Sequence, residues 1–136
     1  MVIHAAMSQS IATVSLLVRD YDEAIAFYCD VVGFDLLANH DLGGGKRWVV
    51  VAPPGRSGAQ LLLARADGPD QEAAVGRQGG GRVMFFLETR NFAKDHAAMV
   101  EHGVRFTEAP RYESYGTVAV WADLYGNTWD LIEPKS

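Results

Sequence analysis

The sequence predicts an α+β protein built from two similar βαβββ modules. Short apolar stretches typical of strands alternate with two segments of helical periodicity, and glycine or proline separates most of them. The order of elements in the first half of the chain recurs in the second half. Because one such module leaves a face of its small sheet uncovered, the two modules are expected to pair within a single domain.

The first module is expected at about residues 11–66. It opens with the apolar strand "IATVSLLV", Ile11 to Val18, and continues with a helix over "DYDEAIAFYCDVV". Asp20 is the expected N-cap of this helix and Gly33 its C-cap. Three short strands then follow at 34–39, 46–52 and 59–65, separated by GGG and PPG turns.

The second module is expected at about residues 82–134 and repeats this order. A strand "RVMFFLET" precedes a helix "FAKDHAAMVEH" that Asn91 caps and Gly103 closes, and strands are expected near 104–107, 116–122 and 128–133. Gly103 follows Gly33 by 70 positions (103 − 33), and Gly126 follows Gly58 by 68 (126 − 58). Residues 67–81 are interpreted as a linker and residues 1–10 as an N-terminal extension, of which 1–6 need not be native.

Composition and charge narrow the classes of function. A chain that is 49% hydrophobic and 21% charged is typical of a soluble globular protein. No apolar run approaches the roughly 20 residues of a membrane span. The net charge of −5 disfavours nucleic acid as a partner, and the single cysteine, Cys29, cannot form an internal disulfide. We therefore expect a cytoplasmic protein with neither nucleic acid nor membrane as a partner.

Two stretches together resemble a known family. "VSLLVRDYDEAIAFYCDVVGF" and "DLYGNTWDLIEP" are similar to the start and end of vicinal oxygen chelate proteins, the superfamily of glyoxalases, bleomycin resistance proteins and dioxygenases. The resemblance covers residues 11–134. It implies two paired modules whose curved mixed sheets form a cleft, and a homodimer. In metal-dependent members, side chains from the first and last strands of the modules hold a divalent ion.

The resemblance places those metal positions at Thr13, Leu62, Val83 and Asp130. Only the last of these is a good ligand for a divalent ion, whereas a catalytic zinc or iron needs about three protein ligands. We therefore expect no metal and no other cofactor. No residue is assigned a catalytic role, because the sequence offers no nucleophile with a base nearby.

Strand alternation predicts which residues face a ligand in the cleft. With Thr13 pointing into it, Ser15 and Leu17 follow by the period of two. The same rule adds residues on the other strands, namely Gln60, Leu62, Val83, Phe85, Thr128, Asp130 and Ile132. Four aromatic residues on or beside the third strands, Trp48, Tyr112, Tyr115 and Trp121, are placed at the mouth, with core packing as the alternative for each.

The resulting hypothesis is a metal-free protein that binds and sequesters a small organic ligand in an apolar cleft. Asp130 would pair with a cationic or hydrogen-bond-donating part of the ligand, because a carboxylate on an apolar wall is costly without a partner. One alternative is a divalent-metal-dependent lyase, isomerase or dioxygenase of the glyoxalase type. Another is an interaction domain whose cleft is filled by its own side chains.

Overall fold

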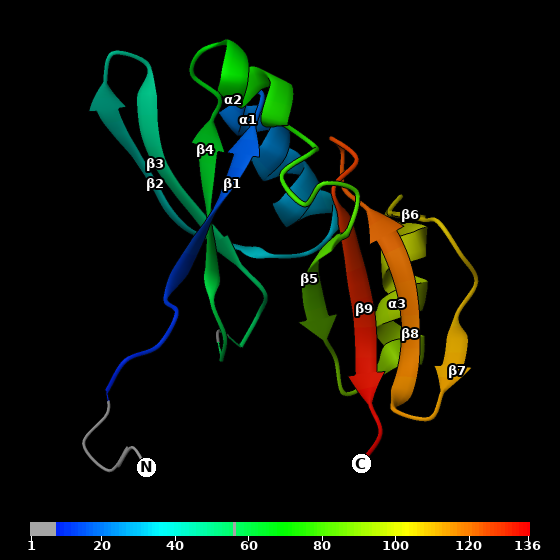
Figure 1. Cartoon of the computed structure of the whole chain (residues 1–136). Coiled ribbons are helices and arrows are strands. Elements are labelled where there is room, and N and C mark those ends of the chain that lie inside the picture. The colour runs from blue at the N-terminus through cyan, green and yellow to red at the C-terminus, as the bar shows by residue number, and fades with distance from the viewer. Residues whose placement is uncertain (1–7, 56) are drawn as a thin grey trace, which may run out of the picture.

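The structure is a computed structural model that describes residues 8–55 and 57–136, and its strands form two mixed sheets (Figure 1). Sheet 1 has the order β1–β4–β3–β2, and sheet 2 has the order β5–β9–β8–β6, with β7 also paired to β8. The strands of sheet 1 are β1 (Thr13–Val18), β2 (Asp35–Gly43), β3 (Lys46–Ala52) and β4 (Gln60–Arg65). Those of sheet 2 are β5 (Val83–Glu88), β6 (Arg105–Phe106), β7 (Arg111–Glu113), β8 (Gly116–Ala122) and β9 (Thr128–Pro134). In each sheet the first strand runs parallel to the last, so the repeat predicted from the sequence is confirmed as two βαβββ units.

The helices begin where the sequence predicts. Asp20 caps α1 (Tyr21–Ile25) by accepting from the Glu23 amide, and Asn91 caps α3 (Phe92–Glu101) by accepting from the Lys94 amide. The chain continues from α1 into η1 (Ala26–Val31), which winds as a π-helix. The segment expected to be an irregular linker contains a short helix, α2 (Pro69–Ala74), with proline in its first turn.

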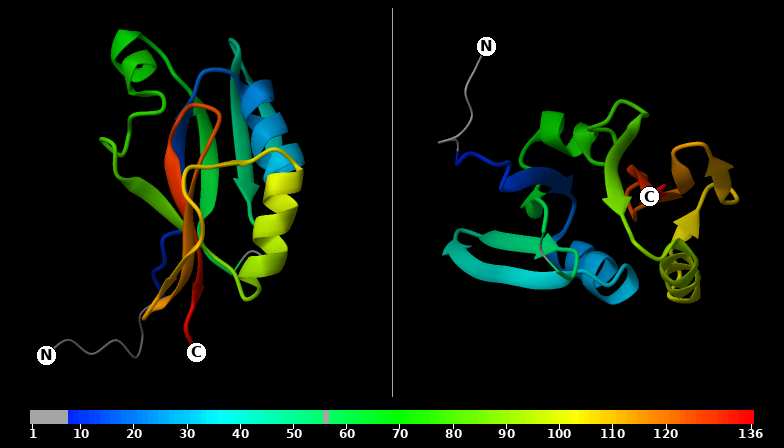
Figure 2. Two further views of the ribbon diagram at one scale, coloured as in Figure 1. Left: turned by 90° about the vertical axis from the view of Figure 1, so that its right-hand side faces the viewer. Right: turned by 90° about the horizontal axis from the view of Figure 1, so that it is seen from below.

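The helices α1, η1 and α3 lie on the same side of the two sheets, and α2 lies on the other side (Figure 2). The core fills the space between the sheets and these helices. It includes buried residues from both modules, among them Leu16, Leu63, Trp121, Trp129 and Leu131. The opposite face of each sheet carries few covering elements, and both of these open faces point toward the viewer in Figure 1. Within one chain the sheets therefore lie side by side rather than face to face.

A buried polar contact joins η1 to the end of the second module. The Tyr28 hydroxyl donates to Asp123 Oδ2 at 2.6 Å. Burial, and then the charge of Asp123, raises the pKa of Tyr28 well above its ordinary value. The ring of Tyr28 lies 5.9 Å from that of Trp129, so one side chain connects the helix of the first module with the last strand of the second.

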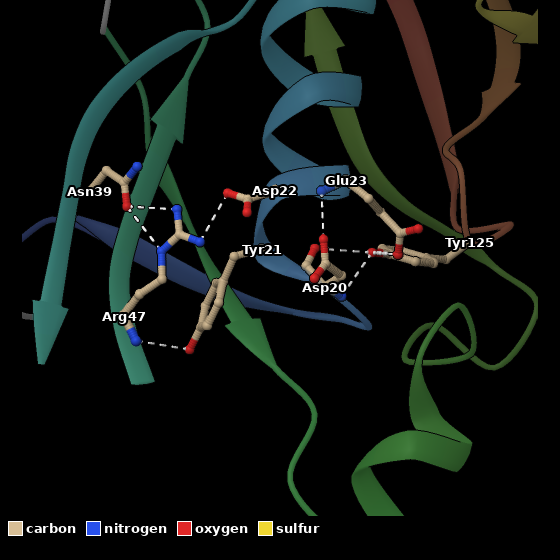
Figure 3. A network of polar contacts seen from close by, with 7 residues as sticks. All are labelled: Asp20, Tyr21, Asp22, Glu23, Asn39, Arg47 and Tyr125. Carbon is tan, nitrogen blue, oxygen red and sulfur yellow. Dashed lines mark hydrogen bonds and ion pairs between the residues drawn. The ribbon is translucent and has the colours of Figure 1, made fainter. Parts of the chain in front are cut away.

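Residues in the first turn of α1 form hydrogen bonds with both modules (Figure 3). On one side Arg47 of β3 donates to Asp22 Oδ1 at 2.9 Å, and its backbone amide donates to the Tyr21 hydroxyl. On the other side the Tyr125 hydroxyl, from the β8–β9 turn, donates to Glu23 Oε2 at 2.7 Å. Burial and this acceptor raise the pKa of Tyr125 to about 12. The Tyr125–Glu23 contact therefore links the β8–β9 turn of the second module to the helix of the first.

No helix in the described residues is long and apolar enough to cross a membrane.

Candidate functional site

The open face of sheet 1 assembles much of the predicted site. Thr13 on β1 is paired with Gln60 on β4, and Ser15 is paired with Leu62. The core lies on the other face of β1, where Leu16 and Val18 are fully buried. Thr13 and Ser15 are exposed, while Gln60 and Leu62 are half-buried. Strand alternation therefore placed these four residues on one face, as predicted.

Trp48 extends this face onto β3. Val50 of β3 is paired with Leu62 of β4, so their side chains lie on the same face. Trp48 lies two residues before Val50 on β3, and its side chain therefore shares the open face with that of Leu62. The indole is 44% exposed, a high value for a tryptophan. Sheet 1 thus presents an aromatic surface beside small hydroxyl and amide groups.

The open face of sheet 2 centres on Asp130. This residue is paired with Phe86 of β5 on one side and with Val120 of β8 on the other. Its side chain is only 9% exposed, and its Oδ1 atom has no hydrogen-bond partner. Burial raises the pKa of Asp130, the charge of Arg111 lowers it, and that of Glu108 raises it. Among the described residues, therefore, Asp130 Oδ1 is a buried hydrogen-bond acceptor without a donor.

Two of the predicted ligand-facing residues face the core instead. Phe85 is paired with Trp129, whose ring centroid lies 4.6 Å away, and Trp121 is fully buried. The register of β5 against β9 shifts between Val83 and Phe85, so alternation fails at this bulge. As a result Val83 is paired with Thr128 on the open face, as predicted, and the phenylalanine on that face is Phe86, which is 64% exposed.

Three further residues of sheet 2 lie on β7 or at the β7–β8 turn. Arg111 of β7 is paired with Val118 of β8, which is paired with Ile132 of β9. Ile132 lies two residues after Asp130, so the side chain of Arg111 projects from the neighbouring row on the same face of the sheet. Tyr115, at the β7–β8 turn, is 53% exposed. Tyr112 is 82% exposed but is paired with Thr117 in the row of Glu133, whose carboxylate accepts from the first amide of α3, so Tyr112 lies on the helix side of the sheet and not beside Asp130. Arg111 was not among the residues predicted from the sequence. The signal for it was its spacing of three residues from Glu108, with which it forms an ion pair.

A groove of about 460 Å³ lies between the modules. Its lining is apolar and aromatic and includes Phe34, Leu61, Phe85, Phe86 and Trp129. Phe86 belongs both to this groove and to the open face that carries Asp130. Of the predicted ligand-facing residues the groove includes Phe85 but not Thr13 or Asp130, so most of them form an open surface beside the groove rather than its walls.

The four family metal positions do not fit a metal centre. Thr13 and Leu62 lie on sheet 1, whereas Val83 and Asp130 lie on sheet 2. Together they offer one carboxylate and one hydroxyl, short of the ligand set that zinc or iron takes in proteins. Nor do three His, Cys, Asp or Glu side chains gather as a metal-binding group anywhere in residues 8–55 and 57–136. His4 lies outside the described residues.

Comparison with known proteins agrees with this architecture. A family model described as the glyoxalase/bleomycin resistance protein/dioxygenase superfamily matches residues 10–131. An uncharacterized protein of Shewanella frigidimarina is 50% identical over 128 residues, which cover 93% of this chain and 95% of that protein. The structure of TnmS3, an antibiotic binding protein from Streptomyces sp. CB03234, superposes with a TM-score of 0.77 at 32% identity, covering 97% of this chain and 100% of the other.

A more distant likeness supports the fold alone. The bleomycin resistance determinant encoded on the transposon Tn5 matches with a TM-score of 0.65 at 22% identity, covering 94% of this chain and 100% of that chain. The order of the strands, the paired modules and the extent of the family match all lead to the same assignment. The chain belongs to the glyoxalase/bleomycin resistance protein/dioxygenase superfamily.

Proposed function

We propose that this protein binds a small organic molecule on its open sheet faces and sequesters it without a metal ion. The observation that carries the proposal is Asp130, a carboxylate 9% exposed whose Oδ1 lacks a partner. Burying such a group costs free energy unless something pairs with it. A ligand that donates a hydrogen bond supplies that partner, while the exposed rings of Trp48 and Phe86 provide surfaces for stacking.

The likeness to TnmS3 supports an antibiotic as the ligand class, because that protein is described as antibiotic binding. In this proposal the ligand contacts Thr13, Ser15, Gln60, Leu62 and Trp48 on sheet 1 and Val83 and Asp130 on sheet 2, with Tyr115 beside Arg111 at the β7–β8 turn. Phe86 takes the place of Phe85. Apolar walls with few polar groups are typical of small-molecule sites.

We further propose that the working form is a cytoplasmic homodimer with neither nucleic acid nor membrane as a partner. The open faces of one chain lie side by side, so a cleft between two sheets requires a second copy. In that arrangement sheet 1 of one protomer covers sheet 2 of the other. The large exposed side chains Trp48 and Phe86 then become buried, which stabilises the pair.

The test combines thermal shift with titration. Wild-type protein is screened against antibiotics, aldehydes and aromatic acids, with and without divalent ions, and every compound that raises the melting temperature is titrated into Asp130→Asn. We expect binding to weaken by about 1–3 kcal/mol, the scale of a charge-assisted hydrogen bond. Glu101→Gln, at the exposed end of α3, is the matched control and should bind as wild type does.

Two outcomes contradict the proposal. The first is a screen in which no compound is bound, or in which Asp130→Asn binds with unchanged affinity. The second is a melting temperature that zinc, manganese or iron raises only when Asp130 is present. This second result supports the metal-dependent enzyme instead.

A further inference from the structure

The edge of sheet 2 has a gap opposite Asp130. β6 ends at Phe106 and β7 begins at Arg111, so Val120 of β8 is paired with Asp130 of β9 on one side but with neither β6 nor β7 on the other. The connecting segment fills the gap with other groups. The Thr107 amide donates to the Val120 carbonyl at 2.8 Å, and the Val120 amide donates to Glu108 Oε1 at 3.1 Å. The Glu108 carboxylate is therefore anchored to the backbone at the row of Asp130.

Glu108 also fixes Arg111. The Nε atom of Arg111 donates to both carboxylate oxygens of Glu108, at 3.1 and 3.0 Å, and Nη1 lies 3.6 Å from Glu113 Oε1. An arginine has more N–H donors than these contacts use. Tyr115 is a further hydrogen-bond partner of Arg111. The side chain of Arg111 is 40% exposed, so the donors that remain are accessible. The single Nε–H, shared between the two Glu108 oxygens, and the ion pair with Glu113 together hold the guanidinium beside Glu108.

The arrangement brings a fixed donor and a free acceptor to one wall. Arg111 starts from the row next to Asp130 on the same face, and the charges of the two residues influence each other. Yet Asp130 Oδ1 has no hydrogen-bond partner, so the pair is not closed on itself. Around it are apolar groups, namely Phe86, Val118, Val120 and Ile132.

We propose that Arg111 and Asp130, in successive rows of one sheet face, act as a donor–acceptor pair that selects neutral aromatic ligands carrying a carbonyl acceptor beside an N–H or O–H donor. This inference rests on the proposed ligand-binding function. Arg111 donates to the carbonyl and Asp130 accepts from the neighbouring N–H or O–H. Glu108 is a positioning residue that holds the guanidinium in place.

The charges around the pair explain the preference for a neutral ligand. Asp130, Glu108 and Glu113 repel an anionic ligand, while Arg111 repels a cation placed where the carbonyl belongs. A ligand with both a donor and an acceptor satisfies both side chains at once. A site built to hydrogen-bond a donor also discriminates against an analogue that lacks it, because the buried acceptor is then left unpaired.

Four naphthalene compounds test the inference by isothermal titration. 2-Naphthamide carries donor and acceptor, and N,N-dimethyl-2-naphthamide carries the acceptor alone. 2-Naphthoate is the anion and 2-naphthylmethylammonium the cation. We expect 2-naphthamide to bind at least about tenfold more tightly than each of the others, the ratio that one good hydrogen bond produces.

Two variants separate the roles of the pair. Arg111→Gln should weaken the binding of both amides, because both present the carbonyl. Asp130→Val should weaken only 2-naphthamide, because the dimethyl compound has no donor to lose. Arg105→Gln is the control: this exposed arginine lies on the short edge strand β6 of the same sheet and should leave all four affinities unchanged. Circular dichroism of each variant checks that it is folded.

The outcomes distinguish this inference from the function on which it rests. If an antibiotic from the screen binds but 2-naphthamide binds no more tightly than its dimethyl analogue, the donor–acceptor assignment is wrong and the ligand-binding function stands. The same holds if none of the four naphthalenes binds while an antibiotic does. If neither the naphthalenes nor the screened compounds bind, both proposals fail.

Discussion

Asp123 and Asp130 lie seven positions apart (130 − 123) in the same C-terminal segment, yet their surroundings are opposite. Asp123 is 4% exposed and accepts from the Tyr28 hydroxyl, the Asn127 side-chain amide and the backbone amides of Tyr125 and Asn127. This network explains why the segment reads D-x-x-GN, since the acid and the asparagine close the turn. Asp123 is therefore structural, whereas Asp130 is left available to a ligand.

We expect opposite effects of the same substitution at these two positions. Asp123→Asn should lower the free energy of unfolding by about 2–3 kcal/mol, because it removes the charge that several buried donors share. Asp130→Asn should leave the free energy unchanged or raise it by up to about 1 kcal/mol, because it removes an unpartnered buried charge. Urea unfolding of both variants measures this, and a loss of stability in Asp130→Asn comparable to that in Asp123→Asn would contradict it.

The effect of Asp130 on stability should depend on pH. Its folded-state pKa is raised above the ordinary value of 3.8, chiefly by burial. Between the unfolded and folded pKa values the native state binds more protons, so the contribution of this group to stability falls as pH rises. Any advantage of Asp130→Asn over wild type at pH 7 should therefore shrink as pH approaches 3.8. Urea unfolding at pH 7, 5 and 4 checks this, and an advantage that grows on acidification would contradict it.

Among the larger elements, the segment that follows α2 docks on both modules. Gln78 contacts the free edge of β1, where the Leu17 amide donates to its Oε1 at 2.7 Å and its Nε2 donates to the Ser15 carbonyl. The side chain thus takes the place of a neighbouring strand at an otherwise unpaired edge. Two residues earlier, Gly76 has a φ of 77° and passes so close to the Tyr125 carbonyl that a Cβ would lie 2.1 Å from its oxygen.

This close approach predicts different effects for two glycines in the segment. Gly80 has a φ of 62° but open space around it, so Gly80→Ala should cost about 1–2 kcal/mol through backbone strain alone. Gly76→Ala adds a clash with backbone atoms and should cost more, about 3 kcal/mol or above. Thermal unfolding of the two variants gives the comparison. Equal losses would mean that the segment moves away from the β8–β9 turn without cost.

For the whole molecule, the main feature is that both sheets keep one open face on the same side. Exposed aromatic side chains lie there on both modules, Trp48 on sheet 1 and Phe86 on sheet 2. Exposed apolar surface of this kind indicates an interaction site. Pairing two chains would cover it and form a cleft between sheets, as we propose.

Sedimentation should therefore give a mass of about twice 14.8 kDa at micromolar concentration. Phe86→Asp places a charge on the open face and should shift the protein toward monomer. Val100→Asp is the matched control, because Val100 is 51% exposed on α3, on the side of the helices, and should leave the dimer intact. A wild-type mass near 14.8 kDa, or equal dissociation in both variants, would contradict the proposed pairing.

The repeat, the helix caps and most of the strands were predictable because each depends on residues close together in the chain. Asp20 and Asn91 cap the helices through amides three positions away, and β3 and β8 run over the residues that periodicity indicates. Alternation along β1 and β4 likewise placed Thr13, Ser15, Gln60 and Leu62 on one face, because these strands pair without a register shift.

Other features depend on contacts between distant segments, and only the tertiary structure decided them. The bulge in β5 arises from its register against β9, and it moves Phe85 to the core and Phe86 to the open face. Trp121 is buried because it stacks on Trp129 of the neighbouring strand, 4.9 Å away. Glu108 reaches the row of Asp130, and brings Arg111 with it, only because the gap between β6 and β7 lies opposite Asp130. Periodicity describes a strand by itself, whereas the face that a side chain occupies depends on the strand with which it pairs.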